Sequence, residues 1–171
     1  MRAIDLIVIH CSASPNGRWV TASDIDVWHH QRGFCRAPSW RNVLNPQLSS
    51  IGYHFVIYTS GAIAAGRALD EIGAHVYGYN RASLGICLIG TDRFAPEQFK
   101  ALSSLISVLR ERYPRARICG HRDLSPDVDG DGLVEPWEWL KTCPGFDVAA
   151  WLQGGMAALP DHLITSLPKG K

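Results

Sequence analysis

Apolar residues occur in short runs along the chain, and several of these runs have the composition of β-strands. Residues 6–9, 53–58 and 84–89 are dense in β-branched, aliphatic or aromatic side chains and end at turn residues, as buried strands do. Residues 62–65 are expected to form a hairpin with the second of these strands, through a serine-glycine turn. Residues 117–120 are expected to form a last short strand.

Helical periodicity is clearest between Pro96, which suits the first turn of a helix, and Pro114, which ends it. Apolar residues recur there every three or four positions: Phe99, Leu102, Leu105, Ile106 and Leu109. A shorter helix is expected over residues 24–32, with Thr21 or Ser23 as its cap, and a terminal helix over 146–152. Residues 33–52, rich in proline, serine, asparagine and arginine, predict a loop.

Strands and helices are interspersed, which predicts an α/β fold: a single domain with a central mixed β-sheet flanked by α-helices. The length of 171 residues fits one domain. We expect the domain over residues 1–156 and a loosely attached C-terminal extension over 157–171, which has two prolines and ends in Lys-Gly-Lys.

Composition and charge narrow the classes of protein. With 46% hydrophobic and 19% charged residues the chain has an ordinary globular composition, and a net charge of +1 gives no field that attracts nucleic acid. No apolar run has the length of a signal-peptide core or a membrane span, so we expect synthesis in the cytoplasm. The five cysteines lack the spacing of a disulfide framework; three in apolar strands are expected to be core thiols, namely Cys11, Cys87 and Cys119.

Three metal-binding side chains stand next to predicted strands or in a later loop. His10 ends the first strand, His121 follows the last, and Cys143 belongs to a Lys-Thr-Cys-Pro segment. Two imidazoles and a thiolate would give zinc three ligands and leave a fourth position open for water, the arrangement of a catalytic site. No local metal motif joins them, and a histidine among seven is more often a structural residue, so spacing alone leaves both interpretations open.

An ordered series of segments resembles a known family. The segments are Val-Ile-His-Cys-Ser-Ala-Ser at 8–14, Ile-Gly-Tyr-His-Phe-Val-Ile at 51–57, Glu-Ile-Gly-Ala-His-Val-Tyr-Gly-Tyr-Asn at 71–80, Ser-Leu-Gly-Ile-Cys-Leu-Ile-Gly at 83–90, Gly-His-Arg-Asp at 120–123 and Lys-Thr-Cys-Pro at 141–144. Over about residues 4–152 they resemble the type 2 N-acetylmuramoyl-L-alanine amidases, which include phage endolysins and share the fold of the peptidoglycan recognition proteins. The resemblance implies hydrolysis of the amide bond between the lactyl group of N-acetylmuramic acid and L-alanine in peptidoglycan.

Carried over by position, the resemblance assigns zinc to His10, His121 and Cys143 and places Tyr53 and Lys141 beside the metal as catalytic partners. Zinc would lower the pKa of a bound water toward about 7 and polarise the scissile carbonyl. Lys141 would stabilise the oxyanion, and Tyr53 would orient the attacking water or pass a proton to the leaving amine. As residues alone, Tyr53 is equally a half-buried strand residue and Lys141 a solvated surface lysine.

Other polar residues receive weaker assignments. His75 and Asn80 belong to the segment that resembles the family's substrate groove, and we expect them to contact substrate. His54 alternates to the opposite strand face from Tyr53 and is left out of the site. The neighbouring histidines at positions 29 and 30 are expected at the surface or in capping roles.

A cluster of acidic residues over 127–138 fits the twelve-residue calcium-binding loop of EF-hands. Its ligands would be Asp127, Asp129, Asp131, the carbonyl of Leu133, and Glu138, with glycine at the sixth position. The alternative is a polar, turn-rich loop, because the preceding segment lacks the helix of an EF-hand. Bound Ca²⁺ would have a structural role, tying down the loop between the second and third predicted zinc ligands.

The leading hypothesis is a zinc amidase whose partner is peptidoglycan and which acts as a monomer. The alternatives are a non-catalytic recognition module of the same fold, a cytoplasmic muropeptide-recycling amidase and a calcium-regulated interaction protein. Cys143 favours catalysis, because the recycling enzymes tend to have aspartate there and recognition proteins that replace the cysteine hold zinc poorly. We therefore expect a phage or prophage endolysin, made in the host cytoplasm and reaching the wall after holin-dependent release.

Overall fold

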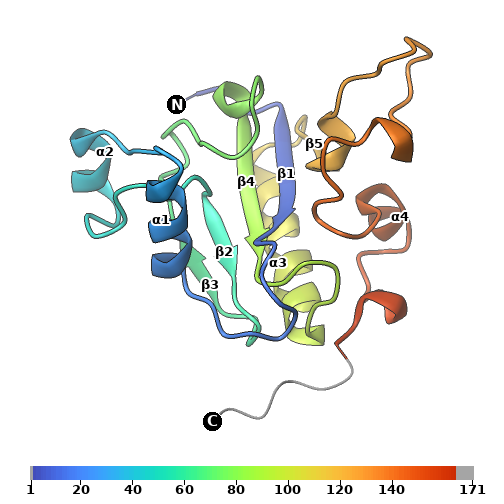
Figure 1. The fold of residues 1–171 in the computed structure, drawn as a ribbon, viewed down its shortest axis with the longest axis horizontal. Coiled ribbons are helices and arrows are strands. Elements are labelled where there is room, and N and C mark those ends of the chain that lie inside the picture. Colours follow the sequence, from blue (N-terminus) through green and yellow to red (C-terminus); the bar gives the residue numbers. More distant parts are fainter. Residues whose placement is uncertain (1, 165–171) are drawn as a thin grey trace.

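The computed structural model describes residues 2–164 and is built around a five-stranded sheet of order β3-β2-β4-β1-β5 (Figure 1). β1 (Leu6–Cys11) pairs in parallel with β4 (Ser83–Leu88) and with β5 (Arg117–Gly120), and β4 pairs in parallel with β2 (Phe55–Ile57). β3 (Ile63–Ala65) is antiparallel to β2. The mixed sheet predicted from the sequence is confirmed.

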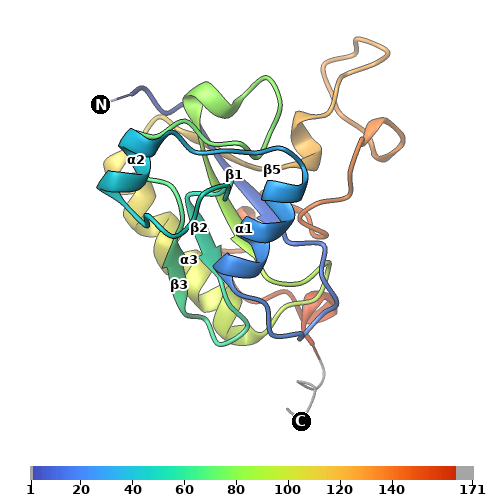
Figure 2. The ribbon, with the colours of Figure 1, turned by 60° about the vertical axis from the view of Figure 1, so that its left-hand side comes forward.

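Helices cover both faces of the sheet (Figures 1 and 2). α1 (Ala22–Gln31) lies on one face and α3 (Pro96–Arg112) on the other, with α4 (Val148–Gln153) beside β5. Thr21 begins α1 through a capping box, so this predicted cap is confirmed. Short 3₁₀ turns complete the helical part, at Asn80–Ala82, Arg122–Leu124, Pro136–Glu138 and Pro160–His162.

The alternation of side chains along β1 sends consecutive residues to opposite faces of the sheet. Ile7 and Ile9 are fully buried in the apolar cluster beneath α3. Val8 and His10 therefore point to the α1 face, where Cys87 and the buried residues of α1 form a second cluster. The well-anchored central strand thus holds His10 on the α1 face, close to the strand's carboxyl end.

The predicted loop over residues 33–52 contains one short helix, α2 (Pro38–Val43), which buries none of its residues. The loop is tied down by a buried ion network: Arg36 donates hydrogen bonds of 2.8–3.2 Å to the Glu71 carboxylate, and Arg67 Nη1 lies 3.3 Å from the same group. Arg36 also donates to the carbonyls of Leu44 and Leu48. The ion network thereby helps to fix the loop, whose Leu48 and Ile51 are also buried in the apolar cluster on the α1 face.

The described part of the C-terminal extension, residues 157–164, contacts the domain through hydrogen bonds and partly buried apolar side chains. The Phe94 N–H donates to the His162 carbonyl at 2.7 Å, and the Ile164 N–H donates to the Phe94 carbonyl at 3.1 Å. Apolar side chains of the segment pack on the cluster beneath α3. Residues 165–171 lie outside the described residues, and the domain boundary at 156 stays a prediction.

None of the helices within residues 2–164 is long and apolar enough to cross a membrane.

Candidate metal centre

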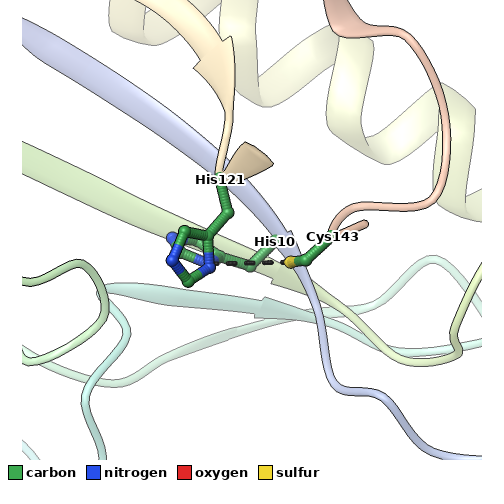
Figure 3. Close-up of side chains that lie close together, drawn as sticks. All are labelled: His10, His121 and Cys143. Carbon is green, nitrogen blue, oxygen red and sulfur yellow. Dashed lines mark hydrogen bonds between the residues drawn. The ribbon is translucent and has the colours of Figure 1, made fainter. Parts of the chain in front are cut away.

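The three predicted zinc ligands converge beside the carboxyl ends of β1 and β5 (Figure 3). His10 Nδ1 lies 3.1 Å from His121 Nδ1 and 3.8 Å from Cys143 Sγ. Zinc–nitrogen bonds of about 2.0–2.1 Å and a zinc–sulfur bond of about 2.3 Å place tetrahedral ligands about 3.3–3.6 Å apart. The observed distances come close to these values, so the three side chains fit zinc.

The protonation of the histidines also suits a metal. Burial lowers the pKa of His10 well below its ordinary value, and the neighbouring histidines lower it further. Burial, with the charge of Lys141, lowers the pKa of His121 to about 4. Both imidazoles are therefore neutral at neutral pH, which is the form that coordinates metals.

The sulfur of Cys143 is held by the end of β1. The Cys11 backbone N–H donates a hydrogen bond of 3.1 Å to Cys143 Sγ. The hydrogen bond to the Cys11 thiol, and then burial, raise the pKa of Cys143, so metal binding must displace the thiol proton. Cys11, Cys87 and Cys119 are buried free thiols, which confirms their prediction as core residues.

Tyr53, predicted as a catalytic partner, lies between two histidines. Its ring centroid is 5.1 Å from that of His10 and 5.2 Å from that of His29. Burial raises the pKa of Tyr53 well above its ordinary value, and nearby thiols add to the effect. The phenol therefore keeps its proton at neutral pH.

Lys141 is exposed and stands two residues before Cys143. Its positive charge adds to burial in lowering the pKa of both His10 and His121, so the ammonium group lies near the predicted metal ligands. Nothing in the structure tests the catalytic roles of Tyr53 and Lys141, which stay predictions.

His29 is a residue of the site that the sequence interpretation missed. Its side chain is buried, so the expected surface role is wrong, whereas His30 is exposed. His29 Nδ1 accepts a hydrogen bond of 2.8 Å from the Gly52 N–H, just before Tyr53. The buried positions of α1, Ala22, Ile25, Asp26 and His29, have helical spacing, and this periodicity was the available signal.

His75 and Asn80, predicted as substrate contacts, lie behind His10. His75 Nδ1 is 3.0 Å from His10 Nε2, and Asn80 Oδ1 accepts hydrogen bonds from the N–H groups of His75 and Val76. Both side chains are thus engaged within the protein, and their contact with substrate stays a prediction. His54, left out of the site, is buried and accepts a hydrogen bond from the Gly85 N–H through Nδ1.

A cavity of about 390 Å³ opens next to the centre, lined by Ser12, Ala13, Ser14, Pro15, Arg18, Trp28, Gln31 and Arg32. A separate, smaller pocket shares Ser12, Trp28 and Arg32 with this cavity and is also lined by Tyr53 and His29. Among the residues the structure describes, neither Arg18 nor Arg32 forms an ion pair with a carboxylate. Two guanidinium groups therefore line the cavity, and that of Arg32 also lines the pocket of Tyr53.

The acidic loop projects from the domain between β5 and α4 (Figure 1). Asp127, Asp129 and Asp131 gather their carboxylates, and Asp129 also groups with Glu135 and Glu138. Most of these carboxylates accept hydrogen bonds from N–H groups of the loop itself. The calcium prediction, including the Leu133 carbonyl, is not tested by this geometry and stays a prediction.

Known proteins that resemble this chain include amidases and endolysins. The family model described as N-acetylmuramoyl-L-alanine amidase matches residues 1–146. The endolysin of Enterobacteria phage K11 is 34% identical over 162 residues, covering 90% of this chain and 89% of that protein. The amidase LysC from Clostridium intestinale is 26% identical, with a TM-score of 0.66 over 91% of this chain and 86% of its own. Drosophila PGRP-LB, 24% identical with a TM-score of 0.61 over 97% of this chain and 88% of its own, shares the fold. The chain therefore belongs to the N-acetylmuramoyl-L-alanine amidase family.

Proposed function

We propose that the protein is a zinc-dependent N-acetylmuramoyl-L-alanine amidase that hydrolyses the bond between the muramic acid lactyl group and L-alanine of peptidoglycan. The observation that carries the proposal is the convergence of His10, His121 and Cys143 at distances that fit zinc. Two neutral histidines and one cysteine supply three ligands, and a catalytic zinc site keeps its fourth position open.

Bound by these side chains, zinc would polarise the scissile carbonyl and activate water at neutral pH. Tyr53 keeps its phenolic proton, so it serves as a hydrogen-bond donor rather than as a base, and it donates to the departing amine of L-alanine. The exposed Lys141 supplies a positive charge beside the developing oxyanion.

The cavity that shares Ser12, Trp28 and Arg32 with the pocket of Tyr53 suits the stem peptide of peptidoglycan. Stem peptides carry free carboxylates, and Arg18 and Arg32 are cavity residues without ion pairs among the described residues. The charge of Arg32 lowers the pKa of the buried His29, which supports a position of the guanidinium close to the smaller pocket. Substrate would thus lie across the α1 face with its amide bond at the metal ligands.

The biological role that fits best is cell-wall lysis by a phage or prophage endolysin. The K11 relative, an endolysin, matches this chain over 89% of its own length, which supports this role. A recognition module without catalysis is disfavoured because Cys143 completes the ligand set. A protein with this role would be made in the host cytoplasm and reach the wall after release, with a holin as the expected route.

The test is mass spectrometry of peptidoglycan digested by the purified protein. We expect free stem peptides that begin with L-alanine, and Cys143→Ala should lose both this product and bound zinc by elemental analysis. Cys35→Ala, which alters an exposed free thiol, is the matched control and should behave as the wild type. Glycan-cleavage or endopeptidase products, or full activity in Cys143→Ala, would refute the proposal.

A further inference from the structure

The two ring nitrogens of His10 have separate partners. Nδ1 faces the other predicted zinc ligands, 3.1 Å from His121 Nδ1 and 3.8 Å from Cys143 Sγ. Nε2 faces the opposite way and lies 3.0 Å from His75 Nδ1. His10 would therefore bind the metal through Nδ1, while His75 contacts the nitrogen that does not bind it.

This arrangement determines where the ring protons lie. A neutral histidine that coordinates a metal through Nδ1 carries its proton on Nε2, so His10 Nε2 is the donor and His75 Nδ1 the acceptor. The proton of His75 is then on its Nε2, which lies 3.3 Å from Ser83 Oγ and donates to it. Each ring nitrogen of His10 and His75 then has one role, as metal ligand, donor or acceptor, and no two N–H groups point at each other.

The ring of His75 is fixed in a narrow slot made by two glycines. A Cβ atom on Gly73 would lie 2.5 Å from His75 Cδ2, and one on Gly85 would lie 2.6 Å from His75 Cγ. Neither distance is compatible with a side chain unless the ring moves. The His54 ring packs edge-on at 5.8 Å, and Asn80 holds the backbone N–H of His75. The slot leaves the ring little freedom to turn away from His10.

We propose that His75 is a positioning residue that keeps the ring proton of His10 on Nε2 and so presents Nδ1 to zinc. The inference rests on the proposed function, because it takes zinc as the metal. Zinc-binding histidines usually donate their second N–H to a carboxylate, a carbonyl or water, and loss of that partner typically costs about 10- to 100-fold in metal affinity. In this chain a neutral imidazole takes that place and adds no charge beside the ligands.

The first test measures zinc affinity by competition with a chromophoric chelator, in the full chain and without substrate. His75→Phe fills the slot with a ring that cannot accept a hydrogen bond, and we expect about 10- to 100-fold weaker zinc binding. His75→Gln offers an amide oxygen as acceptor and should recover most of the affinity. His30→Phe, which alters an exposed histidine of α1, should bind zinc as the wild type does.

The second test needs no substitution and decides the matter even where His75→Phe fails to fold. Long-range ¹H–¹⁵N correlation spectra of the zinc-loaded wild type report which nitrogen of each histidine carries a proton. We expect His10 coordinated through Nδ1 and protonated on Nε2, with His75 protonated on Nε2. Coordination of His10 through Nε2, or wild-type zinc affinity in a folded His75→Phe, overturns the inference while leaving the amidase proposal intact. A wild type that binds no zinc overturns both.

Discussion

The surroundings of Tyr53 keep its phenol un-ionised. It lies in a buried place next to His10, where ionisation is disfavoured and its pKa is raised well above the ordinary value. The phenol is therefore a hydrogen-bond donor in the reaction, because both a base and a proton donor would require Tyr53 to exist as a phenolate.

Tyr53→Phe removes the phenolic proton and leaves the ring. We expect kcat to fall by about 10²- to 10³-fold, the usual cost of removing one hydrogen-bond donor to a developing charge. Zinc content and melting temperature should stay close to those of the wild type, since the ring packing remains. Tyr113→Phe, beyond the end of α3, is the control and should keep its kcat. A Tyr53→Phe enzyme with nearly wild-type kcat would remove Tyr53 from the chemistry.

Among elements, the loop over residues 33–52 depends on a buried charge as well as on the apolar packing of Leu48 and Ile51. Glu71 is 2% exposed and accepts hydrogen bonds from Arg36, with Arg67 at 3.3 Å. Glu71→Gln would leave two buried guanidinium groups without their counter-charge. We expect the free energy of unfolding to drop by about 3–5 kcal/mol, measured by urea denaturation. The exposed Glu97→Gln on α3 should cost less than about 1 kcal/mol, and an equally small loss in Glu71→Gln would contradict this account.

The acidic loop gives a second prediction at the scale of elements. Clustered carboxylates repel one another, so Ca²⁺ that binds the folded loop should stabilise the protein. At about 100 times its dissociation constant the ion adds about 2.7 kcal/mol, or about 5–10 °C in melting temperature for a domain of this size. The measurement compares chelator-treated protein with and without Ca²⁺ while zinc is held constant. Asp129→Asn should reduce the shift, and an unchanged wild-type melting temperature would speak against a calcium site.

The elements could be predicted from the sequence where a pattern of side chains decides them. β1 and β4 are marked by apolar runs and α3 by helical periodicity, because the side chains that these elements bury must be apolar. α2 could not be predicted, since its six residues bury nothing and no periodicity marks it. The role of Glu71 also depends on partners 35 and 4 positions away, which no local pattern reveals.

For the whole molecule, the order of the strands is what completes the candidate site. His10 and His121 come together because β5 pairs in parallel with β1, which places the ends of both strands side by side. The sequence predicted the two strands and their terminal histidines, and the family resemblance supplied their grouping. The pairing itself depends on contacts across 111 positions, so the residues alone did not determine it.

The same architecture buries histidines outside the ligand set, and this predicts how stability depends on pH. Burial lowers the pKa of His54 from its ordinary 6.5 to about 3, and that of His29 to about 4. Between the ordinary and the lowered pKa the unfolded chain binds more protons than the folded chain, so the contribution of these two histidines to stability should be constant above pH 6.5 and decline as the pH falls toward about 4. Each such histidine contributes a slope of up to about 1.4 kcal/mol per pH unit, measured by urea denaturation.

His54→Gln separates this effect from the acid release of zinc. The variant should be less stable at neutral pH, because the hydrogen bond to the Gly85 N–H is disturbed, yet its stability should fall less steeply with acid, because one titrating group is gone. The comparison is made on metal-free protein, where protonation of the zinc ligands does not add the loss of a bound ion. An identical slope in wild type and His54→Gln would show that the buried His54 does not control acid unfolding.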